Sequence, residues 1–195
     1  NESYRRKFQE LCGGDPIVQR LEWSSSNNHL ARAGLAVRLV NWLADRELED
    51  GLEPGRDRVL LWGHSHAGNG FALLSNLLAN NRASVAKFFE VTGNALGEEG
   101  ARARAFLEGG PSPHPWADSL MIATFGTPVR YGWDTDGYRQ LVHVTHHRSF
   151  DDEHPERTIP AVTIGCEDQT FVQTQRLILD VLAARHGDWV QTFAV

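Results

Sequence analysis

The sequence is poor in sulfur and contains no long apolar run. Its 195 residues include one methionine and two cysteines, Cys12 and Cys166, which lie far apart. Two distant cysteines define neither a disulfide framework nor a metal-binding spacing, and they favour reduced thiols in a cytoplasmic enzyme. No segment approaches the ~20 apolar residues that span a bilayer. Residues 1–7 are not followed by the apolar stretch of a signal peptide.

Positive charge is also scarce. Nineteen Lys and Arg residues stand against 25 Asp and Glu residues, for a net charge of −6. Nucleic-acid binding needs clustered Lys and Arg side chains, so a nucleic-acid partner is not expected. The sequence also has no Gly-rich phosphate loop, and we therefore expect no nucleotide and no other cofactor.

Strand-like and helix-like patterns alternate along the chain. This alternation predicts a single α/β domain over residues 1–195, with a mostly parallel sheet and helices on both faces. We expect strands at residues 17–23, 58–62, 119–125, 141–145, 161–164 and 189–195. We expect helices at residues 30–46, 66–79, 85–91, 101–107 and 177–184.

One short motif carries chemistry, namely Gly63-His64-Ser65-His66-Ala67-Gly68. It lies between a predicted buried strand and a predicted amphipathic helix, which is the context of a nucleophile elbow. A serine at such a turn projects away from the backbone, and small residues two positions before and after it let strand and helix approach closely. The motif predicts Ser65 as a nucleophile. The backbone N–H of His66, at the helix start, is predicted to donate to an oxyanion.

The motif and its surroundings resemble the α/β-hydrolase superfamily, and in particular a bacterial lipase-like group. The resemblance extends to Trp23–Asn27, to the turn Thr124–Pro128 and to Leu141–His143. It implies a lipase- or esterase-type hydrolase that cleaves a small-molecule or lipid ester through an acyl-enzyme on Ser65. Two alternatives remain open, a non-catalytic binding module of the same fold and an acyltransferase that uses the same serine.

A serine nucleophile needs a histidine base and a carboxylate that orients it. Asp168 follows the apolar run Ala161–Ile164 and resembles the acid of many α/β-hydrolases, so we expect it to be the acid. Asp151 and Asp152 are the other acid candidates.

The identity of the base is left open by the sequence. His186 follows Asp168 in the usual order, but the predicted topology places it at the far end of the sheet from Ser65. His146 and His147 follow a predicted strand at the right edge but precede Asp168. No predicted strand supplies the second oxyanion N–H. We therefore expect either a chain that is incomplete at both ends or a chain without a working triad.

Residues 82–117 are predicted to be a helical insertion, and one hypothesis makes this insertion a lid over the site. Its aromatic residues are candidates for lining an acyl pocket: Phe88, Phe89, Phe106 and Trp116. Five histidines raise the alternative of a metal site: His64, His66, His143, His146 and His147. We expect no metal, because strand alternation separates His143 from His146. His64 is instead expected to pack under the elbow.

Overall fold

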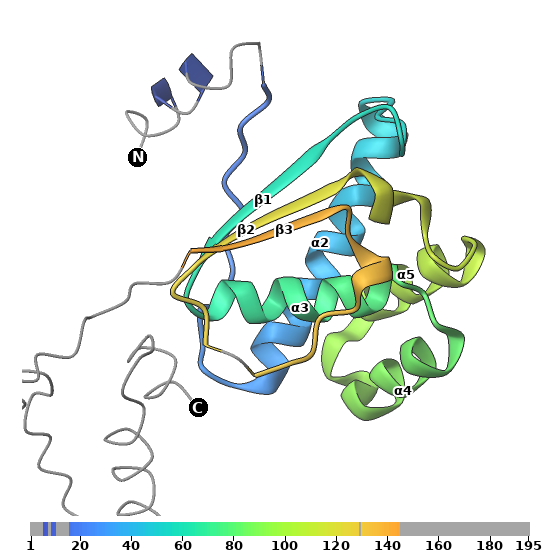
Figure 1. Ribbon diagram of the computed structural model, residues 1–195. Coiled ribbons are helices and arrows are strands. Elements are labelled where there is room, and N and C mark those ends of the chain that lie inside the picture. The colour runs from blue at the N-terminus through green and yellow to red at the C-terminus, as the bar shows by residue number, and fades with distance from the viewer. Residues whose placement is uncertain (1–5, 8, 11–15, 129, 145–195) are drawn as a thin grey trace, which may run out of the picture.

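The sheet has, in the described residues, three parallel strands that lie in the order β1, β2, β3 (Figure 1). The computed structural model describes residues 6–7, 9–10, 16–128 and 130–144. Strand β1 spans Val59–His64, β2 spans Leu120–Phe125 and β3 spans Gln140–Val144. Trp62 pairs with Ala123, and Ala123 pairs with Val142. The parallel pairing confirms the α/β class that the alternating pattern predicts.

A long helix precedes β1, and three helices lie between β1 and β2. α2 spans His29–Glu49, α3 spans His66–Leu78, α4 spans Arg82–Thr92 and α5 spans Gly97–Gly109. Short 3₁₀ turns occur at Gly93–Leu96 (η1), Pro115–Ser119 (η2) and Thr135–Gly137 (η3). α3 follows β1 directly and lies along the sheet, α2 packs against α3, and α5 packs against α2 (Figure 1). The predicted helices within these residues are confirmed.

Helix α2 forms because its ends are capped and one of its faces is apolar. The Asn28 side chain accepts a hydrogen bond from the Ala31 N–H at 2.8 Å, which satisfies a donor of the first turn. Leu35, Leu39 and Leu43 recur at helical spacing and are each at most 3% exposed. α2 therefore forms the back of the core against which α3 packs.

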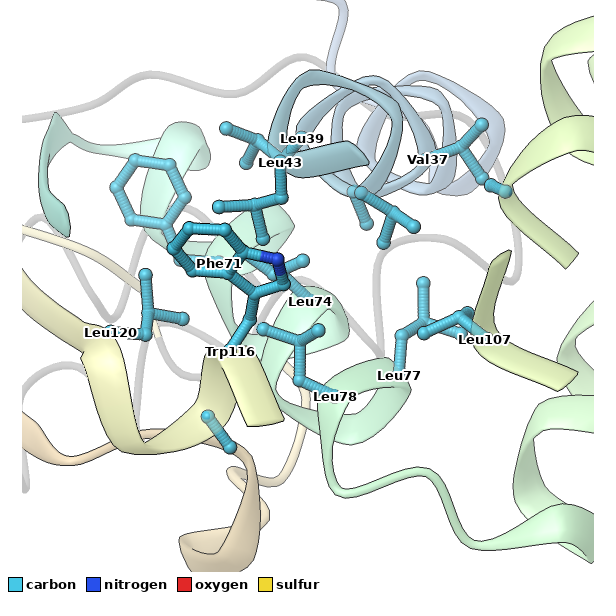
Figure 2. Packing of buried hydrophobic residues seen from close by; sticks show 14 of the residues in the cluster. Val37, Leu39, Leu43, Phe71, Leu74, Leu77, Leu78, Leu107, Trp116 and Leu120 are labelled. Carbon is cyan, nitrogen blue, oxygen red and sulfur yellow. The ribbon is translucent and has the colours of Figure 1, made fainter. Parts of the chain in front are cut away.

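Trp116 lies at the centre of this core, where its indole is surrounded by side chains of α2 and α3 (Figure 2). It is fully buried, and its Nε1–H donates to the Glu47 carboxylate at 2.9 Å. Phe89 is also buried, and Phe106 packs on the ring of His114 with centroids 4.6 Å apart. These three aromatic residues therefore pack in or against the hydrophobic core.

The two faces of the sheet differ in exposure. Val59, Ile122 and Thr124 point toward the helices and are buried. The alternate positions face away from α3 and are about 45% exposed: Leu60, Trp62, Val142 and Val144. Within the described residues the helical layer covers one face, so the expectation of helices on both faces is met on one side only.

Residues 17–23 differ from the prediction, because they form no strand. Ile17 is 83% exposed, and cavities of about 410 Å³ and 380 Å³ lie between this segment and β1. The segment lies beside β1 but does not pair with it as a strand. The predicted elements at 161–164, 177–184 and 189–195 lie outside the described residues. None of the helices described has the length and apolar character needed to cross a membrane.

His114 makes the stability of this fold sensitive to acid. It is 5% exposed, and its Nδ1 accepts a hydrogen bond from the Trp116 N–H at 3.4 Å, which requires an unprotonated nitrogen. Burial lowers the pKa of His114 below its ordinary value of 6.5, and Glu47 opposes this shift. The unfolded chain therefore takes up the proton first, and stability falls as the pH drops below about 6.5.

We expect the His114→Asn variant to lose less melting temperature between pH 7.5 and pH 5 than the native chain does. Asparagine can still cap η2 but takes up no proton. Thermal unfolding at both pH values measures the difference. His64→Asn is the control, because His64 is exposed and its substitution should leave the acid-induced loss unchanged. An equal loss in His114→Asn and the native chain would contradict this account.

Candidate active site

Ser65 occupies a strained turn between β1 and α3. Its backbone has φ 54° and ψ −126°, a region that residues other than glycine rarely adopt. A serine at the start of a helix ordinarily caps it with its hydroxyl, but the Ser65 side chain makes no such bond. The turn therefore leaves Oγ at the carboxyl edge of the sheet rather than using it to hold the helix.

Glycines allow the close approach that this turn requires. A Cβ added at Gly63 would lie 2.5 Å from Phe71 Cε2 and 3.0 Å from Ala67 Cβ. A Cβ added at Gly68 would overlap with the Thr127 side chain. The small side chain of Ala67 is therefore accommodated, whereas Gly63 and Gly68 have no room for a larger residue. These contacts give the spacing of the motif its physical reason.

Hydrogen bonds hold Ser65 from both sides. Its N–H donates to the Phe125 carbonyl at 2.9 Å. Its carbonyl accepts from the Gly68 N–H at 3.1 Å and from Thr127 Oγ1 at 3.0 Å. Thr127 belongs to the turn that follows β2, so this turn lies beside the elbow.

His66 is the first residue of α3. Its backbone N–H is one of the helix donors that have no acceptor inside the helix. Its ring Nδ1 lies 3.5 Å from Nη2 of Arg32. Partial burial, Arg32 and Arg130 lower the pKa of His66 below 6.5. The ring is therefore neutral near pH 7, and its Nδ1 accepts a hydrogen bond from the Arg32 guanidinium.

His64 and His143 lie on opposite faces of the sheet. His64 is exposed on the uncovered face of the sheet, which corrects the expectation that it packs under the elbow. His143 points toward the helices, and its Nδ1 bonds Thr124 Oγ1 at 2.5 Å. Burial lowers the pKa of His143.

The predicted acid and base lie outside the described residues. These residues are Asp168, Asp151, Asp152, His146, His147 and His186. β3 ends at Val144, at the same edge as Ser65, and the chain continues from there to His146. Within the described ranges, no group of three or more His, Cys, Asp or Glu residues could hold a metal ion.

An open groove of about 1050 Å³ lies between α2, α3 and α4. Its lining is mostly apolar and includes Leu30, Ala33, Leu73, Ala83, Phe88 and Val91. Tyr131 and His29 line it as well, and His29 Nδ1 and the Tyr131 hydroxyl are joined by a 2.6 Å hydrogen bond. Tyr131 lies four residues after Thr127, so one loop connects the elbow to this α2–α4 groove.

The sequence analysis did not identify three residues of this region, Arg32, His29 and Tyr131. The position of Arg32 could have been predicted from the helical spacing of the sequence. It lies three and four residues before Leu35 and Ala36, and so continues the buried stripe of α2 toward its N-terminus. His29 and Tyr131 are 102 positions apart, and no local pattern relates them.

The chain matches no protein-family model, no curated protein and no solved structure.

We expect Gly63→Ala to destabilise the fold by about 1–3 kcal/mol, because its methyl group would overlap with the Phe71 ring. Denaturant unfolding measures this loss. Gly109→Ala is the matched control, because an added Cβ there meets nothing within 4 Å. It should change stability by no more than about 0.5 kcal/mol. Equal effects of the two substitutions would show that the elbow is not closely packed.

Proposed function

We propose that this protein is a serine hydrolase of the α/β-hydrolase type, which cleaves a carboxylic ester through an acyl-enzyme on Ser65. The observation that carries the proposal is the positive φ of Ser65 at a strand-to-helix turn. Strained non-glycine residues gather at functional sites, where the surrounding structure holds them in place. If this turn had only a structural role, glycine would form it at a lower free-energy cost than serine.

The proposed reaction follows from the groups around the elbow. Ser65 Oγ attacks the ester carbonyl carbon as a histidine base takes the hydroxyl proton. Negative charge collects on the carbonyl oxygen, where the His66 N–H and the N-terminal end of the α3 dipole stabilise it. The base then gives its proton to the leaving alcohol, and water releases the acid from Ser65 by the same steps.

The apolar lining of the α2–α4 groove favours a substrate that contains an apolar acyl chain. Its lining extends from His29 and Tyr131 along Leu73 to Phe88 and Val91 of α4. Tyr131 lies on the same loop as Thr127, whose hydroxyl donates to the Ser65 carbonyl. Such a surface would bury the methylene groups of an acyl chain at roughly 0.8 kcal/mol for each group.

The first test is labelling with a fluorophosphonate probe. We expect the native chain to be labelled and Ser65→Ala to be unlabelled, because the probe reacts only with an activated hydroxyl. Ser25→Ala is the matched control, since Ser25 also has a positive φ, 53°, but lies at an exposed bend. No labelling of the folded native chain would overturn the enzyme proposal and favour a binding module.

The same probe identifies the base. Among His146→Ala, His147→Ala and His186→Ala, the variant that lacks the base should react more slowly by about 10²-fold or more. If none of the three variants reacts more slowly with the probe, the base is another residue.

Adding a competing alcohol to the ester assay separates hydrolysis from acyl transfer, because a transferase would form the new ester.

A substitution in α4 tests whether the groove binds the acyl chain. We expect Ala83→Trp to lower kcat/KM for a dodecanoyl ester about tenfold or more, because the indole would fill the groove where the acyl chain lies. Acetyl ester hydrolysis and probe labelling should stay within about twofold. Ala86→Trp is the matched control, because Ala86 is exposed on the same helix outside the groove lining. Equal losses for long and short esters would exclude the groove as the acyl site.

A further inference from the structure

Arg32 carries a charge into the interior beside the elbow. Its side chain is 0% exposed, although it belongs to the first turns of α2. Its Nη2 donates to Asn27 Oδ1 and approaches His66 Nδ1 at 3.5 Å. Its Nε is buried without a hydrogen-bond partner. The acceptors around this guanidinium are thus neutral, and one of its donors is unsatisfied.

A buried guanidinium is costly unless an anion lies against it. Among the described residues no carboxylate forms an ion pair with Arg32, whereas Arg46 and Arg102 each pair with acidic side chains. The planar fork of an arginine matches the two oxygens of a carboxylate or a phosphate. Arg32 is therefore arranged as one half of an ion pair.

A second arginine adds positive charge to this region. Arg130 lies on the loop between Thr127 and Tyr131, and its side chain is exposed. After burial, the charges of Arg32 and Arg130 lower the pKa of His66. One arginine belongs to α2 and the other to the loop after β2. Their positive field lies next to Ser65, where a substrate anion would be held close to the reacting ester.

We propose that Arg32 and Arg130 bind a carboxylate or phosphate group of the ester on which Ser65 acts, an inference that rests on the proposed hydrolase function. Arg32 does not line the α2–α4 groove, although Ala33 does. An acyl chain in the groove would therefore place the anion on the alcohol part of the ester. The substrate class is an ester that joins an apolar acyl chain to an anionic alcohol.

The test compares two octanoyl esters, one of a hydroxynitrobenzoic acid and one of nitrophenol, which lacks the carboxylate. We expect the native chain to favour the anionic ester in kcat/KM by about tenfold or more. Arg32→Met and Arg130→Gln should each remove most of this preference. Arg104→Gln, on α5, is the control and should keep the preference. If Arg32→Met fails to fold, Arg130→Gln decides the result.

A binding measurement keeps this inference separate from the hydrolase proposal. Inorganic phosphate or benzoate should raise the melting temperature of Ser65→Ala, and Arg130→Gln in that background should reduce the rise. This result requires no reactive serine, so it would stand even if probe labelling failed. The proposal of an anion-binding site is overturned if neither anion shifts the melting temperature. It is also overturned if Asp168→Asn, Asp151→Asn or Asp152→Asn destabilises the chain as Arg32→Met does, because the counter-ion would then be the chain's own carboxylate.

Discussion

The close approach of α3 to the strands β1 and β2 is the constraint on which the site depends. A non-glycine residue in a rarely populated backbone region costs on the order of 1–3 kcal/mol, and it persists only where its neighbours hold it. At Ser65 the neighbours are Gly63 and Gly68, which leave space for Phe71 and Thr127, and the Thr127 hydroxyl, which binds the Ser65 carbonyl. α3 in turn is held by the leucines of its buried face, which pack against α2. The core therefore maintains the strain at the site.

One helix serves both the core and the site. Leu35, Leu39 and Leu43 of α2 pack into the interior, and the same stripe brings Arg32 to His66 one turn earlier. The positive charge of Arg32 explains in part why His66 stays neutral, which leaves its Nδ1 as an acceptor. The proposed binding of an anion to Arg32 would therefore be linked to the protonation of His66 through one guanidinium.

Local patterns were sufficient to predict the elements around the elbow. The apolar run before Gly63 and the helical spacing after it define β1 and α3, and both follow from periodicity alone. Residues 17–23 were predicted wrongly as a strand, because β-propensity does not reveal whether a neighbouring strand is within reach. The exposure of His64 depends on which face of the sheet is covered, which the strand's own sequence does not specify. The groove depends on His29 and Tyr131 meeting across 102 positions, and this contact is a property of the tertiary fold.

The strands also continue their ladder past their ends. The Ser65 N–H bonds the Phe125 carbonyl, and the Gly126 N–H bonds the Val144 carbonyl, so one backbone bond leads to the next across the sheet. Each of these amides is protected from solvent exchange for as long as its acceptor strand stays paired. The amide protons of Ser65 and Gly126 are thus natural reporters of local opening. Their exchange rates would record how often the edge of the sheet that carries Ser65 opens in the native protein.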